Sequence, residues 1–200
     1  MKTLYFIGGG NLVGGELESI DKIYIKQSSR KSVFVLDLTT NNPEKLAKYR
    51  NFLRNYFVRL GIQKISFFSE SDLENLKGEL NNYDIIYIPG GNTKKLLENL
   101  RLHSIGKILN AYEGIIVGNS AGALVLCKNT IITKDEDNPK TIILEGLGLV
   151  DFSVEVHYDG SQDTELSQIK KNYIIYTIPE AAALIYSKGE IHAVGDVKTF

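Results

Sequence analysis

The sequence predicts an α/β fold in which a mostly parallel sheet is covered by helices on both faces. Over the first 120 residues, short apolar runs alternate with segments that have helical apolar spacing. Three of these apolar runs end in glycine-rich loops, at residues 8–10, 90–91 and 118–122. With right-handed crossovers, the loops meet at the carboxyl edge of the sheet, where such folds carry their sites. A length of 200 residues suits a single domain, 1–200.

The expected strands are uninterrupted apolar runs, which is typical of strands buried on both faces. They cover Leu4–Ile7, Val33–Leu38, Ile65–Phe68, Asp84–Ile88 and residues 115–117. Helices are expected between them over residues 15–28, 43–60, 94–102 and 104–112, with a shorter one opening at Ser71 or Asp72.

After about residue 128 the pattern changes. Strands are expected at Thr130–Thr133 and Val154–Tyr158, and a helix at residues 163–172. Two further strands, Ala182–Tyr186 and Glu190–Val194, flank a short polar turn and predict a C-terminal β-hairpin.

The overall composition argues against several classes of function. The formal net charge of −1 provides no field for nucleic acid or a membrane surface. The apolar run at the N-terminus is too short for a signal peptide, and no other run reaches membrane-spanning length. The single cysteine, Cys127, excludes an internal disulfide and is expected to be a buried thiol. We therefore expect a cytoplasmic protein, either a monomer or a homodimer.

The most informative stretch is the glycine-rich loop at residues 118–122. It has the pattern Gly118-x-Ser120-x-Gly122 between an apolar strand and an apolar helix, as in a nucleophile elbow. A strand that turns directly into a helix needs small residues around the serine, whose hydroxyl is then held at a helix N-terminus. The alternative is a glycine-rich turn that contains a serine by chance.

The first glycine-rich segment, Gly8 to Gly15, fits a dinucleotide-binding loop only loosely. The alternative is that glycine relieves crowding of the backbone at the carboxyl edge of the sheet.

A reactive serine needs a base, and the chain has three histidines. His103 falls in a turn between helices and His192 in the terminal hairpin, so both are expected to be structural. His157 closes a strand beside a polar loop and is the expected general base. Its orienting carboxylate stays open at this point, and chain order favours the 135–137 cluster. The candidates are Asp135, Glu136, Asp137, Glu155 and Asp159.

Two backbone N–H groups should stabilise the oxyanion. The residue after the serine, Ala121, supplies one in elbows of this kind. The loop Gly90-Gly91-Asn92 is the expected source of the other, because glycine lets the backbone approach a substrate closely.

Several of these motifs together resemble peptidase family S51, the family of the aspartyl dipeptidases and, more distantly, of cyanophycinase. The resemblance rests on five segments in order, from about residue 80 to 195: Pro89-Gly90-Gly91-Asn92-Thr93, Gly118-Asn119-Ser120-Ala121-Gly122-Ala123, Asp135, His157-Tyr158 and Ile178-Pro179-Glu180.

The resemblance implies a three-layer, class I glutamine amidotransferase-like fold and hydrolysis of dipeptides with N-terminal aspartate through an acyl-enzyme, without metal or cofactor. It assigns Ser120 as nucleophile, His157 as base and Asp135 as acid. It also assigns Gly91 and Ala121 to the oxyanion hole, and Asn92 and Glu180 to substrate binding.

Two departures from the family pattern bear on specificity. The segment after His157, Gln162 to Gln168, lacks the arginine that reads the substrate aspartate in the aspartyl dipeptidases, and Lys170 and Lys171 are the nearest cations. Alanines 181–183 follow Glu180 where those enzymes tend to have glycine. Two other functions stay open: a catalytically idle binding or regulatory protein of the same fold, and an esterase or amidase with a non-peptide substrate.

Overall fold

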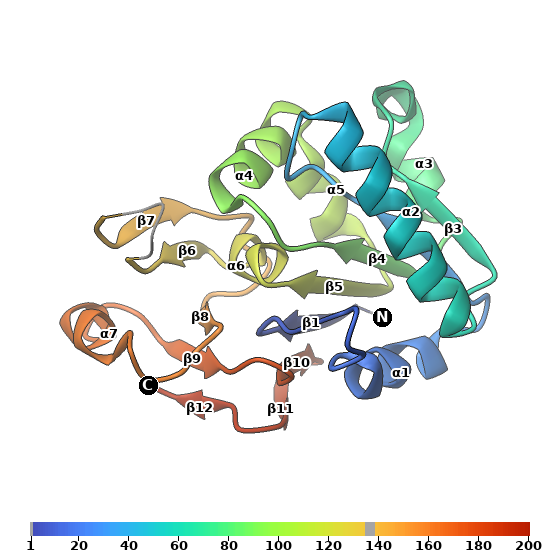
Figure 1. The fold of residues 1–200 in the computed structure, drawn as a ribbon. Coiled ribbons are helices and arrows are strands. Elements are labelled where there is room, and N and C mark those ends of the chain that lie inside the picture. Colours follow the sequence, from blue (N-terminus) through green and yellow to red (C-terminus); the bar gives the residue numbers. More distant parts are fainter. Residues whose placement is uncertain (1, 135–138) are drawn as a thin grey trace.

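A computed structural model describes residues 2–134 and 139–200 (Figure 1). Its main sheet has seven strands in the order β11-β10-β1-β5-β4-β2-β3. The five strands from β1 to β3 in this order are mutually parallel. They are β1 (Thr3–Ile7), β5 (Ile115–Asn119), β4 (Ile85–Ile88), β2 (Ser32–Val35) and β3 (Lys64–Phe67). The predicted α/β class is thus confirmed.

Helices cover both faces of this sheet because its strands are apolar on both faces. Along β1, Leu4 and Phe6 join the core under one helical layer, and Tyr5 and Ile7 join the core under the other. The first layer holds α3 (Leu76–Leu80), α4 (Thr93–Leu102), α5 (Ile105–Ala111) and α6 (Ala121–Leu126). The second holds α1 (Glu18–Gln27) and α2 (Pro43–Arg59).

The start of α2 follows its local sequence, and the start of the short helix expected near residue 71 does not. Asn42 caps α2 by accepting a hydrogen bond from the Lys45 N–H, and Pro43 occupies the first turn. The helix expected to open at Ser71 or Asp72 is instead a 3₁₀ turn, Glu70–Asn75, that leads into the five-residue α3.

The predicted C-terminal hairpin is present and extends the main sheet. Its strands are β10 (Ala183–Ser187) and β11 (Glu190–Val194), and β10 pairs antiparallel with β1. The hairpin therefore covers the edge of β1 that the parallel strands leave open.

Two smaller sheets lie on the side of the molecule opposite α2 and α3 (Figure 1). One pairs β6 (Asn129–Ile132) with β7 (Ile142–Glu145). The other holds β8 (Ser153–Val156), β9 (Ile175–Ile178) and β12 (Lys198–Thr199), with α7 (Asp163–Ile169) between β8 and β9. Strands β7, β9 and β12 were not predicted.

The β8–β9 sheet abuts the carboxyl end of β1. The N–H of His157, just after β8, donates to the Gly8 carbonyl at 2.7 Å, and the Ala181 N–H donates to the Gly9 carbonyl at 2.9 Å. The ends of two sheets thus meet where the sequence predicts the site. Within the described ranges, no helix has the length and apolar character needed to cross a membrane.

Candidate active site

Ser120 lies at the turn between β5 and α6, in a conformation that non-glycine residues rarely adopt (φ 52°, ψ −114°). The flanking glycines explain how the turn closes. A Cβ on Gly118 would overlap the Gly122 carbonyl, and a Cβ on Gly122 would overlap the Ile88 carbonyl of β4. The glycines of the predicted elbow are therefore required by contact of the turn with itself and with the neighbouring strand.

His157 follows β8 of the three-stranded sheet and faces this serine. Its Nε2 lies 2.7 Å from the Ser120 Oγ, and its own backbone is left-handed (φ 51°). The imidazole packs against Gly9, where a Cβ would overlap the ring and where φ is +112°. Gly9 therefore makes room for the histidine ring, whereas a Cβ on Gly8 would overlap the carbonyls of Ile178 and Pro179, which is the backbone crowding expected at this edge.

The carboxylate on the other imidazole nitrogen belongs to Glu180. Its Oε1 lies 3.0 Å from His157 Nδ1, a position that orients the ring and directs Nε2 to the serine. Nothing local in the sequence links these two residues, because they follow different strands, β8 and β9. Asp135, which the resemblance assigns as the acid, lies outside the described residues. Glu155, another candidate, is hydrogen-bonded to Thr133 instead.

The expected oxyanion loop follows β4 and borders the serine. A Cβ on Gly90 would lie 3.2 Å from the Ser120 Cβ, and Gly91 has a φ of +135°. Ala121 is the first residue of α6, so its N–H has no partner within the helix. Asn92, expected in substrate binding, caps α4: its side chain accepts from the Lys95 N–H at 2.8 Å.

A cavity of about 290 Å³ opens beside Ser120 and His157. Its walls come from the oxyanion loop, α6, the end of β6 and β8; they include Gly91, Leu124, Ile131, Thr133, Lys134, Glu155 and Gln162. Glu155 is only 4% exposed. Burial raises the pKa of its carboxyl to about 8, with nearby Glu165 adding to the rise and the Thr133 hydroxyl opposing it.

The remaining histidines and the cysteine have structural places. His103 ends α4 and packs against the Phe68 ring, and His192 lies on β11 near Glu190. Cys127 is buried, so the expectation of a buried thiol is confirmed, and burial raises its pKa to about 12. Among the described residues, no three His, Cys or carboxylate side chains gather as metal ligands would.

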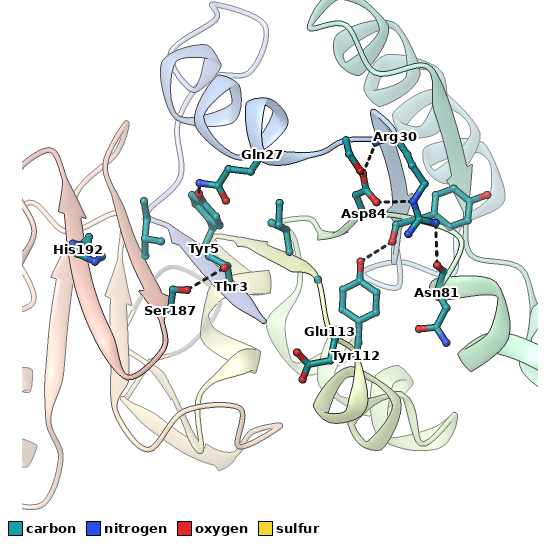
Figure 2. Close-up of a pocket in the computed structure, with 15 residues that line it drawn as sticks. Thr3, Tyr5, Gln27, Arg30, Asn81, Asp84, Tyr112, Glu113, Ser187 and His192 are labelled. Atoms are coloured by element: carbon teal, nitrogen blue, oxygen red, sulfur yellow. Dashed lines mark hydrogen bonds and ion pairs between the residues drawn. The ribbon is translucent and has the colours of Figure 1, made fainter. Parts of the chain in front are cut away.

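A larger cavity, of about 760 Å³, lies at the opposite edge of the sheet, where the parallel strands begin (Figure 2). Several of its polar side chains pair with one another or with the backbone. Asp84 accepts from the Ser28 hydroxyl and the Arg30 N–H, and the Tyr112 hydroxyl donates to the Tyr83 carbonyl. This cavity has neither a nucleophile–base pair nor an unpaired buried polar group among the described residues.

Comparison with known proteins finds matches over most of the chain. The sequence model of peptidase family S51 matches residues 4–194. An uncharacterized peptidase of Listeria monocytogenes is 30% identical over 139 residues, which cover 65% of this chain and 67% of that protein. An uncharacterized peptidase of Bacillus subtilis is 29% identical over 177 residues, covering 82% of this chain and 71% of that protein.

Two solved structures share the fold. A crystal structure described as a peptidase E protein of Listeria monocytogenes superposes with a TM-score of 0.74 at 23% identity, over 97% of this chain and 98% of that one. A peptidase from an acI-B1 actinobacterium gives a TM-score of 0.69 at 17% identity, over 100% of this chain and 97% of that one. The predicted architecture is therefore found in solved peptidase structures.

Proposed function

Because the chain belongs to peptidase family S51 and is a serine peptidase, we propose that it hydrolyses short peptides with Ser120 as nucleophile and His157 as base. The observation that carries this proposal is the 2.7 Å separation of Ser120 Oγ and His157 Nε2. At this distance the imidazole accepts the hydroxyl proton as the oxygen attacks the peptide carbonyl.

The reaction follows from the tautomer that Glu180 selects. With the proton on Nδ1 donated to Glu180, Nε2 is free to take the serine proton and then to return it to the leaving amine. The resulting acyl-enzyme is hydrolysed when the same nitrogen takes a proton from water. We assign the orienting role to Glu180 because its carboxylate is on Nδ1; the assignment of Asp135 stays a prediction from the resemblance.

The oxyanion formed in both steps would be held by the N–H groups of Ala121 and Gly91. The first lies at the N-terminus of α6, next to the nucleophile, and the second lines the same cavity as Ser120. Two such donors contribute several kcal/mol to transition-state stabilisation, on the order of 3 kcal/mol each.

The size of the cavity favours a small substrate, and its charges do not favour aspartate. Lys134 is the one lysine or arginine that lines it within the described ranges, whereas Glu155 lies in its wall. A lysine does not replace the bidentate arginine that the family's aspartate specificity uses. We therefore propose a dipeptidase-like activity on short peptides and treat an Asp-X preference as one outcome of the test.

The test compares wild-type protein with Ser120→Ala on a panel of X-Leu dipeptides and simple esters. We expect turnover of dipeptides by the wild type and a loss of about 10⁶-fold in kcat for the variant. Unchanged far-UV circular dichroism would show that the variant is folded. A fluorophosphonate should label the wild-type serine and leave the variant unlabelled.

Three results would contradict the proposal. Full activity in Ser120→Ala would exclude this serine as the nucleophile. Turnover of esters without any dipeptide hydrolysis would favour the esterase or amidase alternative, and a folded wild type that neither labels nor turns over any substrate would favour an idle binding protein.

A further inference from the structure

The wall of the catalytic cavity holds a carboxylate that the proposed reaction does not use. Glu155 lies on β8 two residues before His157, and 96% of its surface is buried, the complement of its 4% exposure. Its Oε1 accepts a hydrogen bond from the Thr133 hydroxyl at 2.7 Å. Its Oε2 has no hydrogen-bond partner in the part of the chain that the structure describes.

Such a group is unfavourable unless something binds to it. A buried carboxylate with an unpaired oxygen loses the hydration of that oxygen and gains nothing in exchange. Burial accordingly raises the pKa of Glu155 to about 8. The protein thus keeps a poorly solvated acid two residues from its proposed base and in the same cavity as its nucleophile, which is typical of functional sites rather than of packing.

Two ionisable residues lie near Glu155: Glu165, and Lys134, whose charge acts on Glu165. Glu165 of α7 contributes a second carboxylate, held by the Lys134 N–H at 2.9 Å and by the Thr141 hydroxyl. Strand β6 packs on β8, and Leu166 of α7 contacts Ile131 of β6, so these groups converge from three elements. The Lys134 side chain lines the cavity but forms no ion pair with Glu155 in the described chain.

From this geometry we propose that Glu155 makes the cavity a recognition site for a positively charged nitrogen group of the substrate, an ammonium or a guanidinium. The inference rests on the proposed function, because the residue recognised is the one whose carbonyl Ser120 attacks. The charge comes either from the free α-amino group or from a basic side chain. Glu155 lines the same cavity as Ser120 and His157, so a substrate residue bound at Ser120 shares that cavity with the carboxylate.

The kinetic test compares Lys-Leu, norleucine-Leu, Ala-Leu and Asp-Leu, each with a free and an acetylated N-terminus. Norleucine is the uncharged control for lysine. We expect the wild type to prefer the charged member of a matched pair by at least about tenfold in kcat/KM. Glu155→Gln, which keeps the side chain's size and its Thr133 partner, should remove that preference and leave the acetylated norleucine peptide within about threefold of wild type.

The two sources of charge give different results. A loss confined to Lys-Leu assigns the basic side chain, whereas an equal loss for every free N-terminus, absent after acetylation, assigns the α-ammonium. Glu145→Gln, which changes an exposed carboxylate on β7, is the control and should match wild type on all substrates. A wild type that prefers Asp-Leu, or a Glu155→Gln variant with an unchanged preference, overturns the inference.

A binding measurement separates this inference from the proposed catalysis. Calorimetry of acetyl-Lys-Leu and of Lys-Leu on Ser120→Ala needs no turnover, so it tests recognition even if no substrate is cleaved. Because a cation favours the ionised carboxyl, affinity for acetyl-Lys-Leu, whose side-chain ammonium stays charged, should rise between pH 6 and pH 9, through the pKa of about 8. The α-ammonium of Lys-Leu loses its proton in the same range, so only acetyl-Lys-Leu is used for this pH series. His157, Lys134 and Glu165 also face this end of the cavity, so the rise is assigned to Glu155 only if Glu155→Gln abolishes it. No binding of either peptide overturns the inference.

Discussion

At the carboxyl edge of the sheet a cavity of about 290 Å³ lies beside Ser120, and at the amino edge a cavity of about 760 Å³ is bordered by Asp84 and Tyr112 (Figure 2). The smaller cavity has left-handed backbone at Ser120 and His157 and a carboxylate with an unpaired oxygen. The larger has paired polar groups, such as Asp84 with Ser28 and Arg30. Volume alone would therefore select the amino edge, whereas the unpaired buried carboxylate selects the end with the Ser–His pair.

The largest loss of activity is expected from filling the space that Gly9 leaves for the His157 imidazole. In Gly9→Ala the added methyl group overlaps the His157 ring, and φ of +112° is strained for alanine. Displacing the base should lower kcat by about 10³-fold. Gly61→Ala is the control, because Gly61 also has a positive φ but has open space at its Cβ. Equal activities of the two variants would show that Gly9 does not position the base.

A smaller loss should follow from neutralising the carboxylate on His157. Glu180→Gln removes the negative charge and lets an amide N–H face Nδ1, which favours the wrong tautomer, so kcat should fall by about 10²-fold, less than for a buried triad acid. We expect this smaller loss because the Glu180 side chain is 60% exposed, so water can take the place of its carboxylate beside Nδ1. Glu190→Gln, another exposed carboxylate near a histidine, should retain full activity. If Glu180→Gln retains it as well, a different acid, such as Asp135, orients the base.

At the amino edge of the sheet, neutralising the Asp84 carboxylate should lower stability and leave catalysis unchanged. Burial alone would raise the pKa of Asp84, but the hydrogen bonds from the Arg30 N–H and from Ser28, and the charge of Arg30, lower it overall. Asp84→Asn should therefore cost about 1–3 kcal/mol of unfolding free energy at pH 7, with kcat/KM unchanged.

The pH dependence of that effect has a definite sign. A depressed folded-state pKa stabilises the fold above the unfolded value of about 4, and the stabilisation is lost as pH falls through the folded value. Urea denaturation of wild type and Asp84→Asn should therefore converge below about pH 4. A constant difference down to pH 2 would mean that the Asp84 charge is not the cause.

The contribution of Glu155 to stability should depend on pH in the opposite direction to that of Asp84. The carboxyl and amino edges of the sheet should therefore differ in how their stability responds to pH. Its folded-state pKa of about 8 exceeds its unfolded value, so stability is present at low pH and is lost as pH rises through about 8. Glu155→Gln removes this loss and should be more stable than wild type by about 1–2 kcal/mol at pH 9, with the gain vanishing below about pH 4.5. Urea denaturation of wild type and Glu155→Gln at pH 9 and below about pH 4.5 measures this stability difference. A variant that is less stable than wild type at pH 9 would contradict a cost of burying the Glu155 charge.

Much of the fold could be predicted because its signals are local. Apolar runs and helical spacing located the parallel strands and most of the helices, and the turn at Ser187–Gly189 located the terminal hairpin. Strand β9 was missed although residues 173–178 are apolar and β-branched, because no turn signal or alternation separates them from the preceding helix. The 3₁₀ turn before α3 was read as helix because both share the same polar start.

The sequence by itself determined the nucleophile turn and the choice of His157, because glycines two residues on either side of a serine and a histidine at a strand end are local features. Only the tertiary structure decided which carboxylate meets the imidazole, why Gly9 must lack a side chain and that Glu155 has an unpaired oxygen. Those relations join residues 23 to 148 positions apart, across the line where the ends of two sheets meet. Such contacts depend on how the sheets pack, and no spacing along the chain encodes them.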